Sequence, residues 1–362
     1  MQVTLVGFGV VGRALAGQLR DQHALLERLT GGAVVLAGVC DTRGCAVAPR
    51  GLDIDALLAH KATGQSVGSF SSSTGGEGAI ARGFDAGFGP AQFVAAQGRL
   101  AGDAGPRVVV ESGPSDLKHP APAVENLLAA MRSGLHAVSV NKAPLAVAMA
   151  ALLEAAAHNR VQLRYSGTVG AGTPVLALAR QAALGDRVLG VRAIINGTTN
   201  FILHRMATQD EAFDAALAEA VRLGYAEADP SNDIDGVDTA MKLVILANHL
   251  HDLRDGGHRP SYADARVQGI RGLSLALIRE ARARGKTIKL LGSIDVDGGL
   301  KVEPTEVDAG GPMDTPRNVN AVCLSLERCG EVTLVGRGAG GPETATAIVR
   351  DLVDIARVHR GG

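Results

Sequence analysis

QVTLVGFGVVGRALAGQLRDQHALLERL, residues 2–29, decides the fold of the first part of the chain. Residues 2–6 are typical of a short buried strand, and residues 13–29 have the amphipathic spacing of a helix. The segment between them has glycines in G-x-G-x-x-G spacing, which permits a tight turn and lets a pyrophosphate approach the backbone at the helix N-terminus. The stretch therefore predicts a dinucleotide site, and the residues expected to form it are Gly7, Phe8, Gly9, Val10, Val11 and Gly12.

A second strand, residues 33–41, ends in an acidic residue, Asp41. A carboxylate at this position can accept hydrogen bonds from an adenosine ribose diol and repels a 2′-phosphate, which favours NAD over NADP. Arg43 follows two residues later and would attract that phosphate, so the two side chains favour different cofactors. A glycine-rich turn in another kind of α/β protein is the alternative, but strand, turn, helix and acid together favour a Rossmann-type domain.

Two later strands end in polar residues that could reach the same cofactor. RVVVESGPSD, residues 107–116, contains Ser112, and HAVSVNKAPLA, residues 136–146, contains Lys142. Because parallel sheets bind ligands at the carboxyl ends of their strands, we expect both residues near the cofactor. A surface lysine in a loop would give the same pattern at Lys142. Residues 61–89 are rich in Gly and Ser and are expected to form a loop or a crossover extension.

The second half of the chain contains an unusually acidic stretch. GYAEADPSNDIDGVDTAMK, residues 224–242, ends in Lys242 and has five carboxylates, which are Glu227, Asp229, Asp233, Asp235 and Asp238. Asp238 and Lys242 are four residues apart and would share one face of a helix. One interpretation is a solvated acidic loop before a helix N-terminus. The other is a site in which carboxylates hold the ammonium group of an amino acid and the lysine moves a proton.

Other elements of the second half are visible in the pattern. A strand at residues 188–195 leads into NGTTN, residues 196–200, whose side chains suit either helix capping or a substrate pocket. Residues 287–307 predict a strand pair with a turn at Asp297-Gly298-Gly299. The end of the chain predicts a strand, a glycine turn and a helix that could return to the first domain.

Composition excludes several classes of function. The formal net charge of −1 gives no electrostatic reason to expect nucleic acid or an anionic membrane as a partner. The most apolar stretch, which begins at Pro144, is interrupted by Glu154 and is too short to span a bilayer. The four cysteines lack zinc-site spacing and are too few for a disulfide framework, and Met1 leads directly into a strand pattern. We therefore expect no signal peptide and a cytoplasmic protein.

The chain resembles the homoserine dehydrogenase family over nearly its whole length. The resemblance rests on GFGVVG, NKAP, SGTVGAGTP, INGTTNFIL, the acidic stretch 224–242 and the terminal GRGAGGPETATAIVRDLVDIA. It implies an NAD(P)-binding domain over residues 1–150, a mixed α/β catalytic and dimerisation domain over residues 151–320, and a strand-turn-helix over residues 321–362 that returns to the first domain. It also implies a homodimer, and the chain resembles the short form of the family without a regulatory domain.

The family resemblance implies a reaction and a role for particular residues. The reaction is reversible hydride transfer between L-homoserine and L-aspartate 4-semialdehyde, on the route to threonine, methionine and isoleucine. Lys242 resembles the acid–base lysine, and Lys142 the lysine beside the nicotinamide. Glu227 and Asp233 resemble ligands of the substrate amino acid, and Asp238 a polar partner in catalysis and binding. Gly340 resembles a glycine that faces the nicotinamide.

A monovalent cation site is a further expectation from the family. Its backbone carbonyls would belong to Val169, Ala171 and Thr173, and sodium is the expected ion. Ser166 stands here in the place of the glutamate that often completes this site. The absence of that anionic ligand weakens the expectation, although carbonyls and water can hold such an ion.

Two other functions are open at this point. One is another NAD(P)-dependent semialdehyde or amino-acid oxidoreductase of the same architecture, including one that forms a thioester on a cysteine. Cys40 and Cys45 lie near the adenosine end, and Cys323 and Cys329 are expected in a helix, which disfavours the thioester. The other is a dinucleotide-binding redox sensor, which would have no need of the acids around Lys242.

Overall fold

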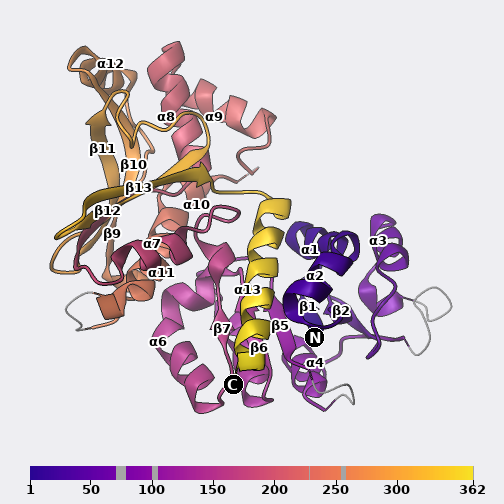
Figure 1. The fold of residues 1–362 in the computed structure, drawn as a ribbon. Coiled ribbons are helices and arrows are strands. Elements are labelled where there is room, and N and C mark those ends of the chain that lie inside the picture. Colours follow the sequence, from indigo (N-terminus) through magenta and orange to yellow (C-terminus); the bar gives the residue numbers. More distant parts are fainter. Residues whose placement is uncertain (71–78, 100–104, 228, 254–257, 362) are drawn as a thin grey trace. The chain divides into compact units, whose positions relative to one another are not determined.

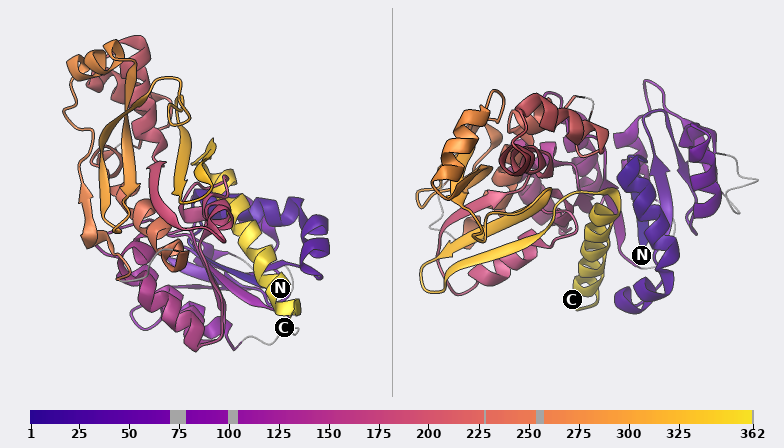
Figure 2. Two further views of the ribbon diagram at one scale, coloured as in Figure 1. Left: turned by 60° about the vertical axis from the view of Figure 1, so that its left-hand side comes forward. Right: turned by 90° about the horizontal axis from the view of Figure 1, so that it is seen from above.

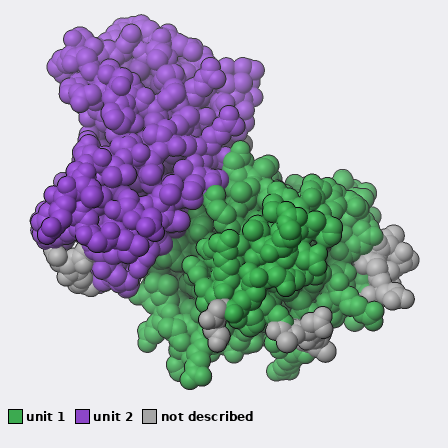
Figure 3. Space-filling view, in the orientation of Figure 1, with its two compact units in different colours: residues 1–168, 340–362 green, residues 169–339 purple. Residues whose placement is uncertain are grey.

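The computed structural model describes residues 1–70, 79–99, 105–227, 229–253 and 258–361, and the chain forms two compact units. Unit 1 comprises residues 1–168 and 340–362, and unit 2 comprises residues 169–339 (Figure 3). These boundaries differ from the expected ones at residues 150 and 320. Residues 151–168 still build the first sheet and the helix beside it, and the last strand pair before residue 340 belongs to the second sheet.

Unit 1 is built on a seven-stranded sheet with the order β4-β3-β2-β1-β5-β6-β7 (Figure 1). Strands β2, β1, β5, β6 and β7 are parallel, whereas β3 and β4 are antiparallel additions at one edge. The parallel strands therefore all terminate on the same side of the sheet, and this class of sheet binds ligands beyond those carboxyl ends. The strands are β1 (Gln2–Val6), β2 (Val35–Cys40), β3 (Gly44–Val47), β4 (Ile80–Gly83), β5 (Arg107–Glu111), β6 (His136–Ser139) and β7 (Leu163–Arg164).

Helices cover both faces of this sheet. The helices of unit 1 are α1 (Val10–Asp21), α2 (His23–Thr30), α3 (Ile54–Ala62), α4 (Pro90–Gln97), α5 (Ala121–Arg132), α6 (Lys142–His158) and α13 (Gly341–Gly361). Val108 and Val110 of β5 join a core with α1, α2 and α13, while Val109 joins a separate core with α4 and α5. Successive residues of a strand face opposite sides, so burial on both faces explains why these strands are continuously apolar.

The C-terminal helix is part of unit 1. α13 packs along α1 (Figures 1 and 2), and its Ile348 and Leu352 share one core with Leu15 of α1. The predicted helix over residues 13–29 is divided at Gln22 into α1 and α2. Amphipathic spacing continues across that break, which is why the sequence did not reveal it.

The loop expected over residues 61–89 is partly wrong. Its described part contains the end of α3, a short 3₁₀ helix η1 (Val67–Ser69) and β4, and residues 71–78 lie outside the described residues. β4 pairs with β3 through backbone hydrogen bonds, and its outer residues are mostly exposed. A strand without an apolar face carries little sequence signal.

Unit 2 contains a six-stranded sheet with the order β13-β12-β8-β10-β11-β9, in which only β9 and β11 pair in parallel. The predicted strand pair at residues 287–307 is confirmed as β10 and β11, and Gly298 in its turn has a φ of 90°. The strands are β8 (Val188–Ile194), β9 (Ala265–Val267), β10 (Lys286–Ile294), β11 (Leu300–Asp308), β12 (Val319–Leu326) and β13 (Gly330–Arg337).

The helix that carries the last two charged residues of the acidic stretch, Asp238 and Lys242, is a buried helix of unit 2. α11 is buried along most of its length and packs on β10, where Leu243 and Thr239 sit over Gly292. The helices of unit 2 are α7 (Val175–Ala183), α8 (Gly197–Gln209), α9 (Phe213–Arg222), α10 (Ser231–Ile234), α11 (Val237–His249) and α12 (Leu275–Ala283). Within the described ranges, no helix is both long and apolar enough to cross a membrane.

Candidate active site

The glycine turn after β1 has the geometry that its spacing predicts. Gly7 has a φ of 94°, and a Cβ there would lie 2.9 Å from backbone atoms of Ser112 and Gly113. A Cβ on Gly12 would lie 2.4 Å from the carbonyl oxygen of Gly7. The Ser112 hydroxyl donates to that same carbonyl at 2.8 Å. The two glycines are therefore required by close packing, and Ser112 fixes the turn from the neighbouring strand.

The N-terminus of α1 follows this turn and suits an anion. Gly9 precedes the helix, and no side chain caps the first amides. Backbone N–H groups at such a terminus can bind a pyrophosphate, and the helix dipole favours its negative charge. Val10 is 67% exposed, whereas the Phe8 side chain is in the apolar core. Phe8 can thus contribute only its backbone to a cofactor site.

Asp41, just after β2, is surrounded by hydrogen-bond donors. Its carboxylate accepts from Lys61 Nζ at 2.6 Å and from Ser66 Oγ at 2.8 Å, and also from the amides of Arg43, Gly44 and Val67. Burial alone would raise the pKa of Asp41, but Lys61 and the other donors lower it to about 2. Asp41 is therefore ionised at neutral pH. Lys61 was not identified from the sequence because it lies 20 residues away in α3.

Arg43 is exposed at the turn that follows Asp41. Its guanidinium donates to the carbonyl of Gly64 at 3.1 Å. Lys61, by contrast, contacts the Asp41 carboxylate directly, whereas Arg43 contacts it only through its backbone amide.

The carboxyl ends of β5 and β6 form a second group of polar residues. Asn141 caps α6 through the amide of Ala143 and donates to the carbonyl of Pro114 at 3.0 Å. Lys142 is the first residue of α6, and its amide donates to Ser115 Oγ at 3.0 Å. Burial raises the pKa of the adjacent Glu111, against hydrogen bonds from Asn126 and the Gly113 amide.

Gly340 lies directly before α13. It has a φ of 134°, and a Cβ there would lie 1.9 Å from the Glu343 carboxylate. The positive φ favours glycine at this position, whereas the Glu343 side chain is flexible and could move away from a Cβ.

In unit 2, Lys242 and Asp238 form a buried ion pair on α11. Lys242 Nζ lies 2.7 Å from Asp238 Oδ2, with both side chains almost inaccessible to solvent. The ammonium also donates to the carbonyl of Ile195 at 2.7 Å. The spacing of four residues predicted this arrangement, and the contact with Ile195 adds a fixed direction to the lysine.

Asn196 joins two of the acids. Its Nδ2 donates to Asp233 Oδ1 at 2.6 Å and to Asp238 Oδ2 at 2.9 Å. Burial, and then the nearby Asp238, raise the pKa of Asp233, and the hydrogen bond from Asn196 acts in the opposite direction. Asp233, Asp238 and Lys242 are thus brought together in one cluster, which we call the acid–lysine cluster; Asp238 and Lys242 are buried and Asp233 is half-buried.

The remaining acids of the motif have other positions. Asp235 forms a two-bond ion pair with Arg271 at 2.8 and 2.9 Å on the surface. Asp229 accepts from the amide of Ser231 at 3.1 Å. Glu227 is exposed, next to residue 228, which lies outside the described residues. The structure therefore separates Asp235 as a surface residue from the acid–lysine cluster.

The second glycine turn has an unusual backbone. Gly170 and Ala171 have φ values of 83° and 42°, and the latter is uncommon for a residue with a side chain. Thr173 O accepts from the amide of Val175 at 2.7 Å, so one carbonyl of the expected cation site already has a partner. Among the residues that the structure describes, no group of three or more His, Cys, Asp or Glu could hold a metal ion.

Ser166 is bound by a carboxylate from the last helix. Its amide and its hydroxyl donate to Asp351 at 3.0 and 2.6 Å. Burial raises the pKa of Asp351 to about 6, against these two bonds. The side chain that replaces the glutamate of the family is therefore already engaged within unit 1.

The cysteines do not have the properties of a nucleophile. Burial raises the pKa of Cys40 and that of Cys45, the latter to about 11, and both lie in an apolar core. The expectation of a helix at Cys323 and Cys329 is wrong: Cys323 is buried in strand β12, and Cys329 is exposed at the turn that follows. A hydrogen bond to Asp186 raises the pKa of Cys329. Thiols of this kind are poorly ionised and unreactive.

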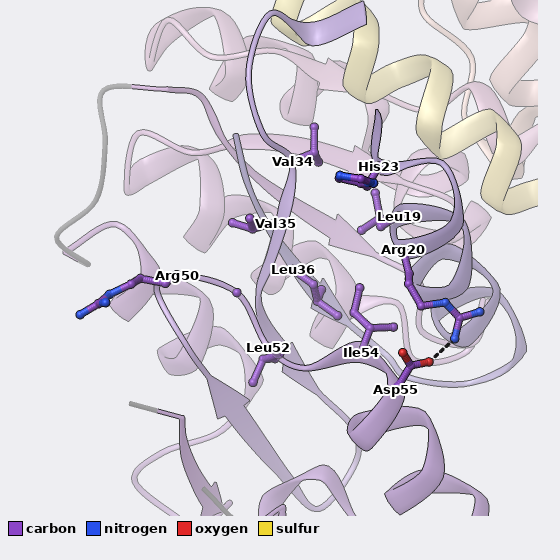
Figure 4. Close-up of a pocket in the computed structure, with 11 residues that line it drawn as sticks. Leu19, Arg20, His23, Val34, Val35, Leu36, Arg50, Leu52, Ile54 and Asp55 are labelled. Carbon is purple, nitrogen blue, oxygen red and sulfur yellow. Dashed lines mark hydrogen bonds and ion pairs between the residues drawn. The ribbon is translucent and has the colours of Figure 1, made fainter. Parts of the chain in front are cut away.

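A surface pocket of about 330 Å³ lies elsewhere in unit 1, at the amino end of β2 (Figure 4). An ion pair between Arg20 and Asp55 lies at its edge, while Arg50 extends away from the other lining residues. Asp41 follows the opposite end of the same strand. This pocket is therefore separate from the glycine turn.

A Rossmann-type unit with a glycine turn, joined to a unit with a buried lysine–carboxylate cluster, defines an NAD(P)-dependent oxidoreductase. Two family models specify it further. The model for the NAD-binding domain of homoserine dehydrogenase matches residues 7–166, and the model for homoserine dehydrogenase matches residues 174–353. The chain belongs to the homoserine dehydrogenase family.

Individual proteins agree with this assignment. The homoserine dehydrogenase of Methanocaldococcus jannaschii is 34% identical over 98% of this chain and 98% of its own length. The NAD(+)-dependent homoserine dehydrogenase of Pseudomonas canavaninivorans is 34% identical over 98% of this chain and 96% of its own. The crystal structure of a homoserine dehydrogenase from Thiobacillus denitrificans superposes with a TM-score of 0.80 at 28% identity, covering 100% of this chain and 74% of that one.

Proposed function

We propose that this chain interconverts L-homoserine and L-aspartate 4-semialdehyde with Lys242 as the acid–base group. The observation that carries the proposal is the buried ammonium of Lys242, held by Asp238 and the carbonyl of Ile195 beside Asp233. This order of groups suits a substrate that has an ammonium group at one end and a hydroxyl or aldehyde at the other.

The chain's own residues perform the proton transfer. The bound nicotinamide supplies or accepts the hydride. In aldehyde reduction, negative charge develops on the carbonyl oxygen, and the Lys242 ammonium stabilises it and donates a proton to form the alcohol. In homoserine oxidation, the neutral amine of Lys242 accepts the hydroxyl proton. Asp238 orients the lysine and compensates its charge, because the two atoms are 2.7 Å apart.

Carboxylates select the substrate. Asp233 in the acid–lysine cluster and Glu227 at the exposed edge of the motif would bind the substrate ammonium group. Lys142 would act on the cofactor side, where it begins α6 after β6 and positions the nicotinamide and the reacting oxygen.

The cofactor site would use the glycine turn, the N-terminus of α1 and Gly340. We propose NAD as the preferred cofactor, supported by the ionised Asp41 carboxylate and by the similarity to the NAD(+)-dependent homoserine dehydrogenase of Pseudomonas canavaninivorans. Arg43 and Lys61 oppose this preference, because each would attract a 2′-phosphate.

A monovalent cation site on the carbonyls of Val169, Ala171 and Thr173 is a separate proposal. The positive φ values of Gly170 and Ala171 support the cation site, because they change the direction of the backbone within the loop whose carbonyls would bind the ion. The partner already held by Thr173 O limits its strength. Equal homoserine turnover in sodium, potassium and tetramethylammonium buffers, with no ion in a high-resolution map, would remove the proposal.

We also propose a homodimer in the cytoplasm. Family membership supports the dimer, and four unpaired cysteines suit a reducing compartment. Light scattering of the purified chain measures its mass in solution and so tests the homodimer.

The direct experiment is homoserine oxidation by the purified chain with NAD and with NADP, followed through the reduced nicotinamide. Turnover that is lost in Lys242→Ala supports the function. A thioester enzyme would instead be inactivated by iodoacetamide, with labelling of one cysteine. Binding of the dinucleotide without turnover of homoserine or aspartate semialdehyde would contradict an enzyme and favour a redox sensor.

A further inference from the structure

Asn196 lies between the acid–lysine cluster and α8, and both polar atoms of its side-chain amide form hydrogen bonds. It is 3% exposed. Its Oδ1 accepts from the amide of Thr199 at 2.9 Å and so caps α8. Its Nδ2 has two N–H bonds, and two carboxylates accept from it, Asp233 at 2.6 Å and Asp238 at 2.9 Å.

Capping alone does not require asparagine. Serine, threonine and aspartate cap helices about as well, because each has an oxygen that accepts from the first turn. Among these residues only asparagine also has an NH₂ group that can donate to two acceptors. The chemistry that distinguishes Asn196 from other caps is therefore its contact with the two acids.

The two acids need such a donor. Asp233 and Asp238 come from different helices, α10 and α11, and their mutual repulsion favours protonation of one of them. Asp233 faces Asp238 and Lys242 from α11, and Asn196 and Thr198 from the α8 side. An amide that donates to both carboxylates offsets the repulsion without adding a charge that would compete with the substrate ammonium group.

Lys242 is held by Ile195, the residue that precedes Asn196. Its ammonium donates to the carbonyl of Ile195, so two consecutive residues bind both sides of the cluster. Asp238 Oδ2 accepts from Lys242 and from Asn196 at once. A change in the Asn196 side chain would thus be transmitted to the lysine through one oxygen atom.

We propose that Asn196 is a positioning residue of the reaction, which ties the substrate-binding carboxylate of Asp233 to the Asp238–Lys242 pair. The inference rests on the proposed roles of these three residues. Asn196 does not touch the reacting atoms; it keeps Asp233 ionised to receive the substrate ammonium group and keeps Asp238 oriented toward Lys242.

Asn196→Ser is the informative variant, because serine preserves the cap and removes the bridge. We expect kcat/KM for homoserine to fall by about 10- to 100-fold, as for small misplacements of catalytic groups. Two acidic limbs are expected in homoserine oxidation: kcat falls as Lys242 becomes protonated, and KM for homoserine rises as Asp233 becomes protonated. The limb in KM should move to higher pH in Asn196→Ser, since Asp233 loses a bond that favours its ionised form. The KM for NAD should not change. Asn196→Asp should have a larger effect, because it adds a third carboxylate.

Asn200→Ser is the matched control. Asn200 lies one turn further along α8, is equally buried, and donates to Thr315 and to the carbonyl of Val319. It should lower stability without moving the limb in KM. If Asn196→Ser has a kcat/KM within about twofold of the control and the same limb in KM, the inference is wrong. If the wild type does not turn over homoserine at all, the proposed function itself has failed, which is a distinguishable result.

Discussion

Lys242 and Asp238 lie one helical turn apart on α11, with the ammonium nitrogen 2.7 Å from a carboxylate oxygen and both side chains buried. Removing ions from water is costly, so a buried pair is weak evidence for a stabilising contact. Losing one partner is costlier still, because the remaining charge is left uncompensated. The pair therefore has its clearest explanation in chemistry, where a lysine must be held in one position and must exchange a proton.

Lys242→Ala should lower the turnover of homoserine by about two to four orders of magnitude, the usual effect of losing a general acid or base. Substrate affinity should change less, because the proposed ligands of the ammonium group are carboxylates and not Lys242. In the wild type, homoserine oxidation should decline on acidification as the base becomes protonated, and the variant should lose that limb. Steady-state kinetics as a function of pH measures both effects.

Lys289→Met is the control for this variant. Lys289 is also a buried lysine of unit 2, 1% exposed and bound to Asn200 and Thr315. The variant Lys289→Met should be less stable than the wild type, and its homoserine oxidation should still decline on acidification. Near-normal turnover in Lys242→Ala, with an unchanged profile, would contradict the assignment and make Lys142 the better candidate.

Lys142→Ala should also reduce turnover, but through the hydride step. The residue begins α6, and its amide is bound by Ser115. If it positions the nicotinamide and the reacting oxygen, the variant should show a larger primary isotope effect with deuterated homoserine, because hydride transfer becomes slower than the other steps. A variant with wild-type turnover and isotope effect would show that Lys142 has no catalytic part.

Local patterns predicted the parts of these sites that lie close together in the sequence. The spacing of Gly7 and Gly12 and the four-residue spacing of Asp238 and Lys242 follow directly from turn and helix geometry, and the structure has both. The division between Asp233, which joins the cluster, and Asp235, which pairs with Arg271, was not visible, because it depends on a residue 36 positions away.

Long-range partners were missed for the same reason. Asn196 and Asp238 are 42 positions apart, and Ser166 and Asp351 are 185 apart. A polar residue after a strand is as typical of a helix cap as of a site, so only the contacts decide. The helix expected at Cys323 failed because tertiary packing in a sheet overrode a short, ambiguous apolar run.

Glu227→Gln should mainly raise the KM for homoserine. If Glu227 binds the substrate ammonium group as proposed, the change removes one charge from that site and keeps the shape of the side chain, so binding should weaken while the acid–lysine cluster remains intact. An increase of about tenfold corresponds to the loss of one partly exposed charge contact, about 1.4 kcal/mol. Asp229→Asn, two residues later in the same exposed segment, is the control and should leave KM unchanged. A fall in kcat with an unchanged KM would assign Glu227 to the chemical step instead.

Asp41→Ser should shift the cofactor preference toward NADP. The variant removes the carboxylate that we propose to repel the 2′-phosphate, and it releases Lys61, whose Nζ lies 2.6 Å from that carboxylate in the wild type. We expect the ratio of kcat/KM for NADP to that for NAD to rise by about tenfold or more, since each 1.4 kcal/mol of charge interaction is one factor of ten. Asp55→Ser, an exposed acid of α3, is the control. A wild-type enzyme that already prefers NADP would contradict the proposed role of Asp41.

Asp351→Asn should stabilise the protein at neutral pH. Burial raises the folded-state pKa of Asp351 to about 6, above the usual value of an aspartate in an unfolded chain, so folding disfavours the ionised form. At low pH the carboxyl group is protonated in both the folded and the unfolded chain, and it does not reduce the free energy of unfolding. That free energy falls as pH rises from the unfolded pKa toward 6, because only the unfolded chain then ionises. The loss is roughly 3 kcal/mol for a shift of about two pKa units. Asparagine has no charge to bury, and it can still accept from the Ser166 amide.

The comparison between pH values separates this effect from a simple packing change. The midpoint of urea unfolding should be higher for Asp351→Asn than for the wild type at pH 7.5, and the difference should shrink or reverse at pH 5. Asp354→Asn removes a partly buried charge from the same helix and leaves the contact between Ser166 and Asp351 in place, so its difference from the wild type should vary much less with pH. A difference for Asp351→Asn that is the same at both pH values would show that Asp351 is not neutralised by folding. The carboxylate would then be one that α13 needs in its charged form to bind Ser166.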